Sequence, residues 1–130
     1  MAAMSWSVNI QISGGPGISA SAASQPIEAT DRVEVVIAPG DADRVVDLQP
    51  GAAAAIRLLM IKSSRYGDDL AYTVSDGTDD SDPITLDGPQ IFTAGSAALF
   101  GVAPRQLKFT NTNADHAAAV EIFVARDATP

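Results

Sequence analysis

The residues with the clearest chemical potential are four aspartates in one short polar segment. Asp76, Asp79, Asp80 and Asp82 lie within the sequence SDGTDDSDP. Carboxylates at this density can bind Ca²⁺, which takes about six to eight oxygen ligands. The spacing differs from that of an EF-hand loop, since both the D-x-[DN]-x-[DN]-G pattern and its closing glutamate are missing. We favour an exposed, hydrated turn and keep calcium binding as the alternative.

Few residues are candidates for catalysis. His116 is the single histidine, and it stands beside Asp115 in a polar segment. A serine hydrolase needs its nucleophile on a strained turn, and the chain has no G-x-S-x-G sequence. The Gly14-Gly15-Pro16-Gly17 sequence is predicted to be a turn rather than a phosphate cradle, because neither a lysine nor a helix follows it. We therefore predict a non-enzymatic protein with no catalytic residue and no cofactor.

These residues must be positioned by β-strands, which the sequence marks by alternation. In residues 5–12, Trp6, Val8, Ile10 and Ile12 alternate with polar residues, as expected for a strand with one buried face. Turn sequences rich in Gly, Pro and Asp separate further segments of this kind. Those segments are residues 27–37, 44–48, 70–75, 84–86, 90–94, 97–102, 106–112 and 117–126.

Two other segments are ambiguous. Residues 52–64 begin with four alanines and continue with Ile, Leu and Met, which suits a buried helix or a buried strand. We predict a central strand buried on both faces, because no N-cap residue precedes the segment and its neighbours are strands. Residues 14–30 include a Ser/Ala-rich stretch and are predicted to be an extended arm or a weak edge strand, with a disordered segment as the alternative.

The pattern predicts an all-β fold. About eight or nine short strands, without a convincing amphipathic helix, indicate an antiparallel β-sandwich of the jelly-roll or Ig-like kind. We expect one domain over residues 1–130. Two short connections predict hairpins: segment 70–75 with the strand before it, and segment 106–112 with segment 117–126.

The composition argues against several classes of partner. Eight Lys and Arg against sixteen Asp and Glu give a net charge of −8, whereas nucleic-acid binding depends on clustered cations. No stretch approaches the roughly 18 apolar residues of a membrane span, and the N-terminus lacks a signal-peptide pattern. The chain has no cysteine, so it has neither disulfides nor thiolate metal ligands. We predict a soluble, unprocessed protein that binds neither nucleic acid nor membranes.

Five cations surround two of the predicted strand pairs. They are Arg57, Lys62, Arg65, Arg105 and Lys108. If neighbouring strands bring them together, they form an electropositive strip suited to an acidic partner.

The C-terminal half of the chain carries a resemblance. Residues 58–95 read LLMIKSSRYGDDLAYTVSDGTDDSDPITLDGPQIFTAG, and residues 103–130 read APRQLKFTNTNADHAAAVEIFVARDATP. They contain a Y-G-D-x-L turn, an I-T-L-D-G-P turn and an L-x-F-T-N sequence before the final strand. In this order of turns and strands, the chain resembles the small β-rich structural proteins of tailed bacteriophages, which include head decoration or cement proteins.

The resemblance implies a virion protein that is made in the bacterial host cytoplasm. It implies a partner in the major capsid protein or another virion protein, with many copies stabilising the head lattice, and a homo-oligomer such as a trimer. One alternative is a tail or neck component. Another is a small carbohydrate- or ligand-binding module, which needs aromatic rings on an exposed face. Trp6 lies on the apolar side of its strand, so we expect it in the core instead.

Overall fold

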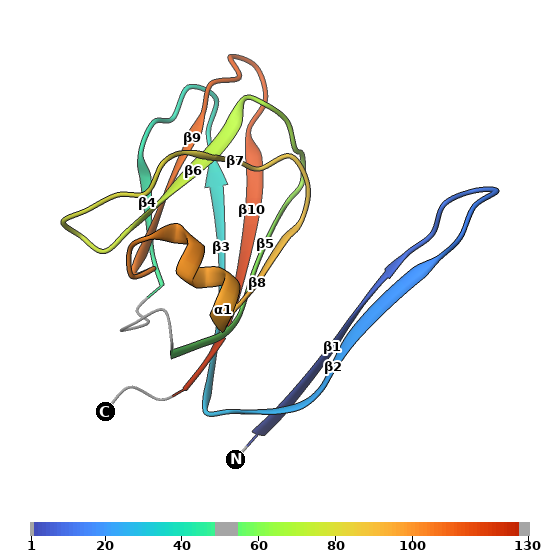
Figure 1. Cartoon of the computed structure of the whole chain (residues 1–130). Helices are drawn as coiled ribbons and strands as arrows, with labels where there is room; N and C mark the ends of the chain where they lie inside the picture. Colours follow the sequence, from blue (N-terminus) through green and yellow to red (C-terminus); the bar gives the residue numbers. More distant parts are fainter. Residues whose placement is uncertain (1, 49–54, 128–130) are drawn as a thin grey trace.

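The chain is built mostly from β-strands (Figure 1), so the prediction of an all-β fold is confirmed. The computed structural model describes residues 2–48 and 55–127. The elements in these ranges are β1 (Ala2–Ile10), β2 (Ile18–Ile27), β3 (Ala29–Ile37), β4 (Arg44–Asp47), β5 (Ile56–Ser63), β6 (Leu70–Ser75), β7 (Ile84–Thr85), β8 (Gln90–Thr93), α1 (Ala94–Ala97), the 3₁₀ turn η2 (Ala98–Phe100), β9 (Gln106–Asn111) and β10 (Ala118–Arg126).

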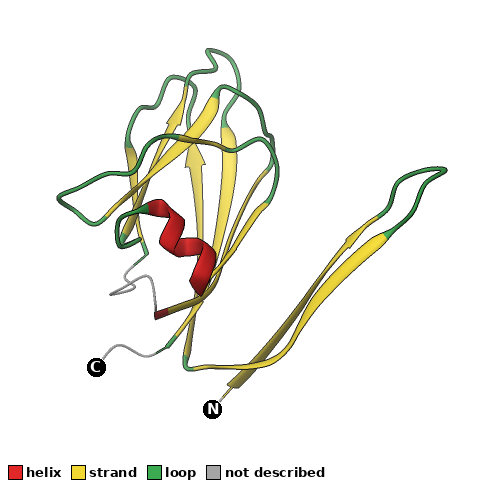
Figure 2. Cartoon of the chain, in the orientation of Figure 1, coloured by secondary structure: helices red, strands yellow, loops and turns green. Residues whose placement is uncertain are grey.

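Eight of these strands form two four-stranded antiparallel sheets, which we call the body (Figure 2). One sheet has the order β3-β10-β5-β8, and the other has the order β4-β9-β6-β7. The pairs β3 with β10, β4 with β9, β5 with β8 and β6 with β7 are nested inside one another. The chain therefore doubles back between β6 and β7, and the resulting ribbon of paired strands contributes to both sheets.

The two sheets enclose one large hydrophobic core. In β9, Leu107 and Phe109 are fully buried, and the residues between them are only partly covered. The ring of Phe109 lies 5.6 Å from that of Tyr72 on β6, centroid to centroid. From the other sheet, Ile61 and Ile122 belong to the same cluster of buried side chains. The alternating apolar residues of the sequence thus face inward, as a half-buried strand requires.

β5 is a central strand, as predicted for residues 52–64. It lies between β10 and β8. Leu59 and Ile61 face the core, whereas on the other face Leu58 is buried, Met60 is partly covered and Lys62 is exposed. The predicted burial on both faces therefore holds only at Leu58. Residues 52–54 of the predicted segment lie outside the described residues.

The prediction of two hairpins is wrong. β5 and β6 belong to different sheets, and so do β9 and β10. A short connection can turn back within one sheet or cross the core to the other. Apolar alternation records which face of a strand is buried, but it does not record which strand lies beside it.

A buried polar cluster holds these crossing connections together. Asn111 at the end of β9 is fully buried. Its Nδ2 donates to the carbonyl oxygens of Ile37 (3.2 Å) and His116 (2.9 Å). Its Oδ1 accepts a hydrogen bond from Arg65 Nη2 at 2.7 Å, and Arg65 Nη1 lies 2.8 Å from Asp69 Oδ1. One side chain thereby joins the end of β3 to the β5–β6 and β9–β10 connections.

The prediction of a strand over residues 97–102 is also wrong, because α1 and η2 occupy this region. The backbone N–H of Thr93 donates to Ser96 Oγ at 2.7 Å, which closes a capping box at the start of α1. Alanine favours the helical turn, and Gly101, with φ of 76°, ends it in the left-handed conformation. Local capping therefore outweighed the apolar content of the segment.

Candidate assembly surfaces

β1 and β2 form a long hairpin that projects from the body (Figure 1). They pair from Ala2 opposite Ile27 to Ile10 opposite Ile18. Gly14 supplies the positive φ of 75° that the turn requires. We call residues 2–27 the arm. The segment predicted as an arm or weak edge strand, residues 14–30, is thus the second half of a longer hairpin, and a bend at Glu28 interrupts the strand predicted over residues 27–37.

The arm differs from the body in charge and in the composition of its two faces. Residues 1–27 contain no Asp, Glu, Lys, Arg or His, so the whole net charge of −8 belongs to the rest of the chain. The register of the hairpin separates apolar from polar side chains. Trp6, Val8, Ile10, Ile18, Ala20 and Ala22 share one face, and Ser7, Asn9, Ser19 and Ser21 share the other.

The apolar face of the arm is covered at its base and open near its turn. At the base, Met4, Trp6 and Phe123 pack against the buried residues Ile27, Leu58 and Ala125. Toward the turn, the exposed fraction is 52% for Ile10, 59% for Ile12 and 65% for Ile18. We call these three isoleucines the arm tip. An isolated two-stranded hairpin is marginally stable in water, and in the described chain nothing covers this end of the hairpin.

The junction between arm and body is held by packing. Trp6 Nε1 and Gln25 Oε1 are buried there, and neither has a hydrogen-bond partner among the described residues. A buried polar atom without a partner costs roughly 1–3 kcal/mol. Apolar contacts at the base must therefore outweigh this cost for the arm to keep its orientation.

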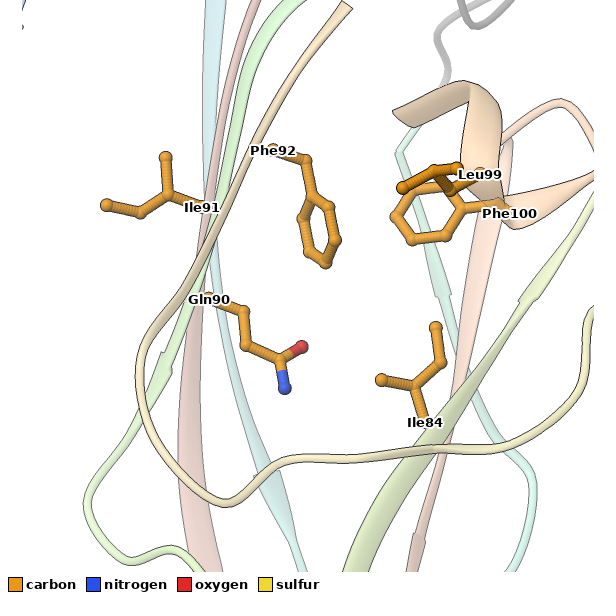
Figure 3. Close-up of a pocket in the computed structure, with 6 residues that line it drawn as sticks. All are labelled: Ile84, Gln90, Ile91, Phe92, Leu99 and Phe100. Atoms are coloured by element: carbon orange, nitrogen blue, oxygen red, sulfur yellow. The ribbon is translucent and has the colours of Figure 1, made fainter. Parts of the chain in front are cut away.

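A second apolar surface lies where the two sheets end side by side. β8 is an edge strand of one sheet and β7 of the other, and α1 and η2 follow directly after β8. A pocket of about 430 Å³ opens between them, and we call it the edge pocket (Figure 3). It is lined by Ile84, Gln90, Ile91, Phe92, Leu99 and Phe100.

The aromatic rings of the edge pocket support one another. The Phe92 and Phe100 rings pack at 4.8 Å between centroids with 58° between their planes. Leu99 beside them is 85% exposed, the largest value among the exposed large apolar side chains of the described chain. In Figure 3, Phe92 and Gln90 point into the pocket, while Ile91 points to the other side of β8. The pocket therefore offers apolar contacts around an uncovered leucine.

The one polar group of the edge pocket already has partners. Gln90 Oε1 accepts a hydrogen bond from the Tyr72 hydroxyl at 2.6 Å, and its Nε2 donates to the Thr85 carbonyl oxygen at 2.8 Å. Burial raises the pKa of the Tyr72 hydroxyl, so this group stays protonated as a donor. A polar ligand such as a sugar would have to displace these bonds.

The acidic segment behaves as a turn. Asp76 Oδ1 accepts hydrogen bonds from the backbone N–H groups of Thr78 (2.8 Å) and Asp79 (2.7 Å), and these bonds hold the pKa of Asp76 below its ordinary value. Asp80 lies 3.1 Å from Lys108 Nζ. In residues 2–48 and 55–127, no three His, Asp or Glu side chains are placed to hold a metal ion. The geometry gives the calcium hypothesis for Asp76, Asp79, Asp80 and Asp82 no support.

The five cations do not form an electropositive strip. Arg57 pairs with Asp127, Lys62 with Glu121, Arg65 with Asp69 and Lys108 with Asp80. Arg57 and Lys62 belong to β5, Lys108 belongs to β9 in the other sheet, and Arg65 lies in the β5–β6 connection. The cations are therefore distributed over both sheets. The fifth, Arg105, contributes an attractive charge to the Asp76 carboxylate.

His116 lies on the surface in the β9–β10 connection. Its carbonyl oxygen accepts the hydrogen bond from Asn111, and its backbone N–H donates to Asn113 Oδ1 at 2.8 Å. The backbone of His116 is thus part of the polar cluster around Asn111.

Sequence patterns did not reveal the edge pocket, since Leu99 and Phe100 were assigned to a strand. The Leu-Phe-Gly sequence, in which a glycine can end a helical turn, was the available signal.

No helix in the described part of the chain is both long and apolar enough to cross a membrane. No protein-family model, curated protein or solved structure matches this chain, so its functional interpretation depends on the body, the arm and the edge pocket.

Proposed function

We propose that this chain is a non-enzymatic structural protein of a tailed-phage virion, most closely a decoration protein that binds the head lattice in many copies. The observation that carries the proposal is the uncharged, two-faced arm projecting from a compact β body. An assembly protein needs a surface that is soluble before assembly and apolar at the contact. The charge of the acidic body favours solubility before assembly, and the arm provides the apolar contact surface.

We infer further that the body is a jelly roll rather than an Ig-like sandwich. A jelly roll contains eight strands in two Greek keys, and this architecture recurs in viral capsid proteins. The nested pairing of β3 with β10, through to β6 with β7, supports this choice. In an Ig-like sandwich several consecutive strands lie side by side. Within the described body, only β6 and β7 are both consecutive and neighbouring.

The proposed role is mechanical. A protein that binds the assembled lattice but not the separate capsid subunits stabilises the assembled state by mass action. The contact must bury roughly 1,000 Å² or more to be specific. A two-faced hairpin suits this role, because its apolar face can be buried while its serine-rich face stays in water.

A tail or neck component is the closest alternative, and it differs in copy number. The carbohydrate-binding alternative has less support. The Tyr72 ring is buried in the core, and Trp6 packs at the base of the arm, so neither forms an exposed stacking platform.

Copy counting tests the proposal. Virus particles purified from the source culture would be digested, and this chain would be quantified by mass spectrometry relative to the major capsid protein. Hundreds of copies per particle are expected of a decoration protein. A few copies per particle would move the chain to the neck or tail, and complete absence from particles would overturn the virion role.

A further inference from the structure

We propose that the arm tip of one copy docks into the edge pocket of a second copy, so that the chain associates with itself through exchanged arms. This inference goes beyond the virion role and does not depend on it, because it concerns contacts between identical chains. The arm tip is Ile10, Ile12 and Ile18, and the pocket is centred on Leu99, Phe92 and Phe100.

The exposed apolar side chains of the described residues gather mainly at two places. The described residues include seven large apolar side chains that are exposed. Three of them form the arm tip and two, Ile91 and Leu99, line the edge pocket. The remaining two, Val36 and Val45, lie on β3 and β4, the edge strands at the other side of the body. Ile91 points to the other side of β8, so docking of the arm tip at Leu99 removes four of the seven side chains from water, namely Ile10, Ile12, Ile18 and Leu99.

The two surfaces are also the uncharged parts of a negatively charged chain. Two copies repel each other, since each carries a net charge of −8. The arm has no charged residue, and neither do the six residues that line the edge pocket. A contact between these two regions therefore brings together the least charged parts of the two chains. Charged residues are depleted in the same way at the centres of protein interfaces.

The arm is long enough to reach a neighbouring molecule. The nine residues of β1 span about 30 Å at roughly 3.3 Å per residue. A body of about 100 residues has a radius of gyration near 13 Å, so the arm is as long as the body is wide. The arm extends away from its own body in Figure 1. Its tip is thus placed to meet a neighbouring molecule.

The symmetry follows from the surfaces involved. Reciprocal exchange of arms between two copies gives a two-fold dimer, whereas an arm passed to the next copy in one direction gives a heterologous contact. Repeated contacts of this kind close into a ring when the rotation between copies allows it. A cyclic oligomer is the expected product.

Cysteine cross-linking tests the contact directly, and the chain contains no cysteine of its own. Two single variants, Ile18→Cys and Leu99→Cys, would be mixed and oxidised. A disulfide-linked dimer containing one chain of each variant is expected. Val45→Cys mixed with Leu99→Cys is the matched control, because Val45 is exposed but lies on β4, away from both surfaces.

Two results of the cross-linking would overturn the proposal. One is the absence of a mixed dimer at concentrations where the unmodified chain is oligomeric, which would mean that another surface makes the contact. The other concerns a chain that carries both Ile18→Cys and Leu99→Cys. A disulfide formed within single molecules of this double variant and never between molecules would mean that the arm folds back onto its own pocket.

Sedimentation measurements with charge substitutions supply the second test. Ile18→Asp and Leu99→Asp are each expected to weaken self-association by roughly 30-fold or more, as for residues at the centre of an interface. Val45→Asp is expected to leave it unchanged. A chain that stays monomeric at all concentrations would overturn the proposal and leave the virion role standing. A chain that cross-links as expected but is absent from particles would overturn the virion role alone.

Discussion

The arm and the body differ in how their apolar faces are covered. Each sheet of the body buries one face against the other sheet, and polar side chains such as Asn111 join its connections. The arm has only two strands, and its apolar face is covered by the body at the base alone. The body therefore covers its own apolar core, whereas the arm is covered only where it contacts the body at its base.

The comparison teaches where interaction surfaces arise in a small β protein. Charge is concentrated on the body, where ion pairs such as Arg65–Asp69 are made within the chain. Apolar exposure is concentrated on the arm tip and at the edge pocket. The parts of the chain that stabilise it internally are thus separate from the parts available to a partner.

The largest expected effect is in the core. Phe109→Ala removes a fully buried ring between the sheets and should lower the free energy of unfolding by about 3–5 kcal/mol. Ile18→Ala in the arm tip should change it by less than about 0.5 kcal/mol, because that side chain is mostly exposed. Chemical denaturation measures both. Equal losses would mean that the arm is part of the same cooperative unit.

The next effect is at the base of the arm. Trp6→Ala removes the side chain that packs the arm against Leu58 and Ala125 of the body, and it should destabilise the arm locally by about 1–3 kcal/mol. Hydrogen exchange should then accelerate in β2 while β9 keeps its protection. Ser7→Ala on the polar face is the control and should leave both strands unchanged. A loss of protection in β9 would contradict the separation of arm and body.

Acid should affect the body and spare the arm. Hydrogen bonds from Arg65 and Asn113 hold the pKa of Asp69 below its ordinary value, and Arg32 does the same for Glu121. The folded body therefore binds fewer protons than the unfolded chain near pH 4. The stabilisation is complete above about pH 5 and is lost as the pH falls through the folded-state pKa values.

Denaturation midpoints at pH 7 and pH 3 would measure this loss in the body. Asp69→Asn should make the loss smaller, since it removes one of the contributing carboxylates. The arm has no titratable side chain, so its exchange protection factors should not change with pH while the body remains folded. A parallel loss of protection in the arm would show that the two regions are coupled.

The smallest effect is in the turn of the arm. Gly14→Ala places a side chain at φ of 75° with no neighbouring atom within 4 Å, so the cost is backbone strain alone, about 1 kcal/mol. Gly88→Ala in the body is the matched control, because its site is equally open and its φ is not in the left-handed region. Faster exchange in β1 and β2 of the first variant alone is the expected result.

Much of the fold was visible in the sequence. Alternating apolar residues located most of the strands, and the segment after Gly51 was correctly interpreted as a central strand. The errors have a common origin. The strand expected over residues 97–102 is helical because Thr93 and Ser96 form a cap, and the expected hairpins are connections that cross between sheets.

Some features of the candidate sites follow from local sequence, and others depend on contacts between distant residues. The acidic segment does contain a turn, in which Asp76 accepts hydrogen bonds from backbone N–H groups two and three residues away. The cations were wrongly grouped, since four of them pair with acidic side chains, and three of these partners are far away in the sequence, as Arg57 and Asp127 illustrate. The edge pocket depends on β7, β8 and η2 meeting in space, which no local pattern records.

The sequence by itself determined where most of the strands lie, which of their faces is apolar, and that the first 27 residues carry no charged side chain. These are properties of consecutive residues and of side chains alternating along an extended backbone. Only the tertiary structure decided that β3 pairs with β10, that the arm projects, and that Leu99 is exposed beside Phe92. Strand partners are chosen by the burial of apolar surface over the whole chain, and that choice is made between residues far apart in the sequence.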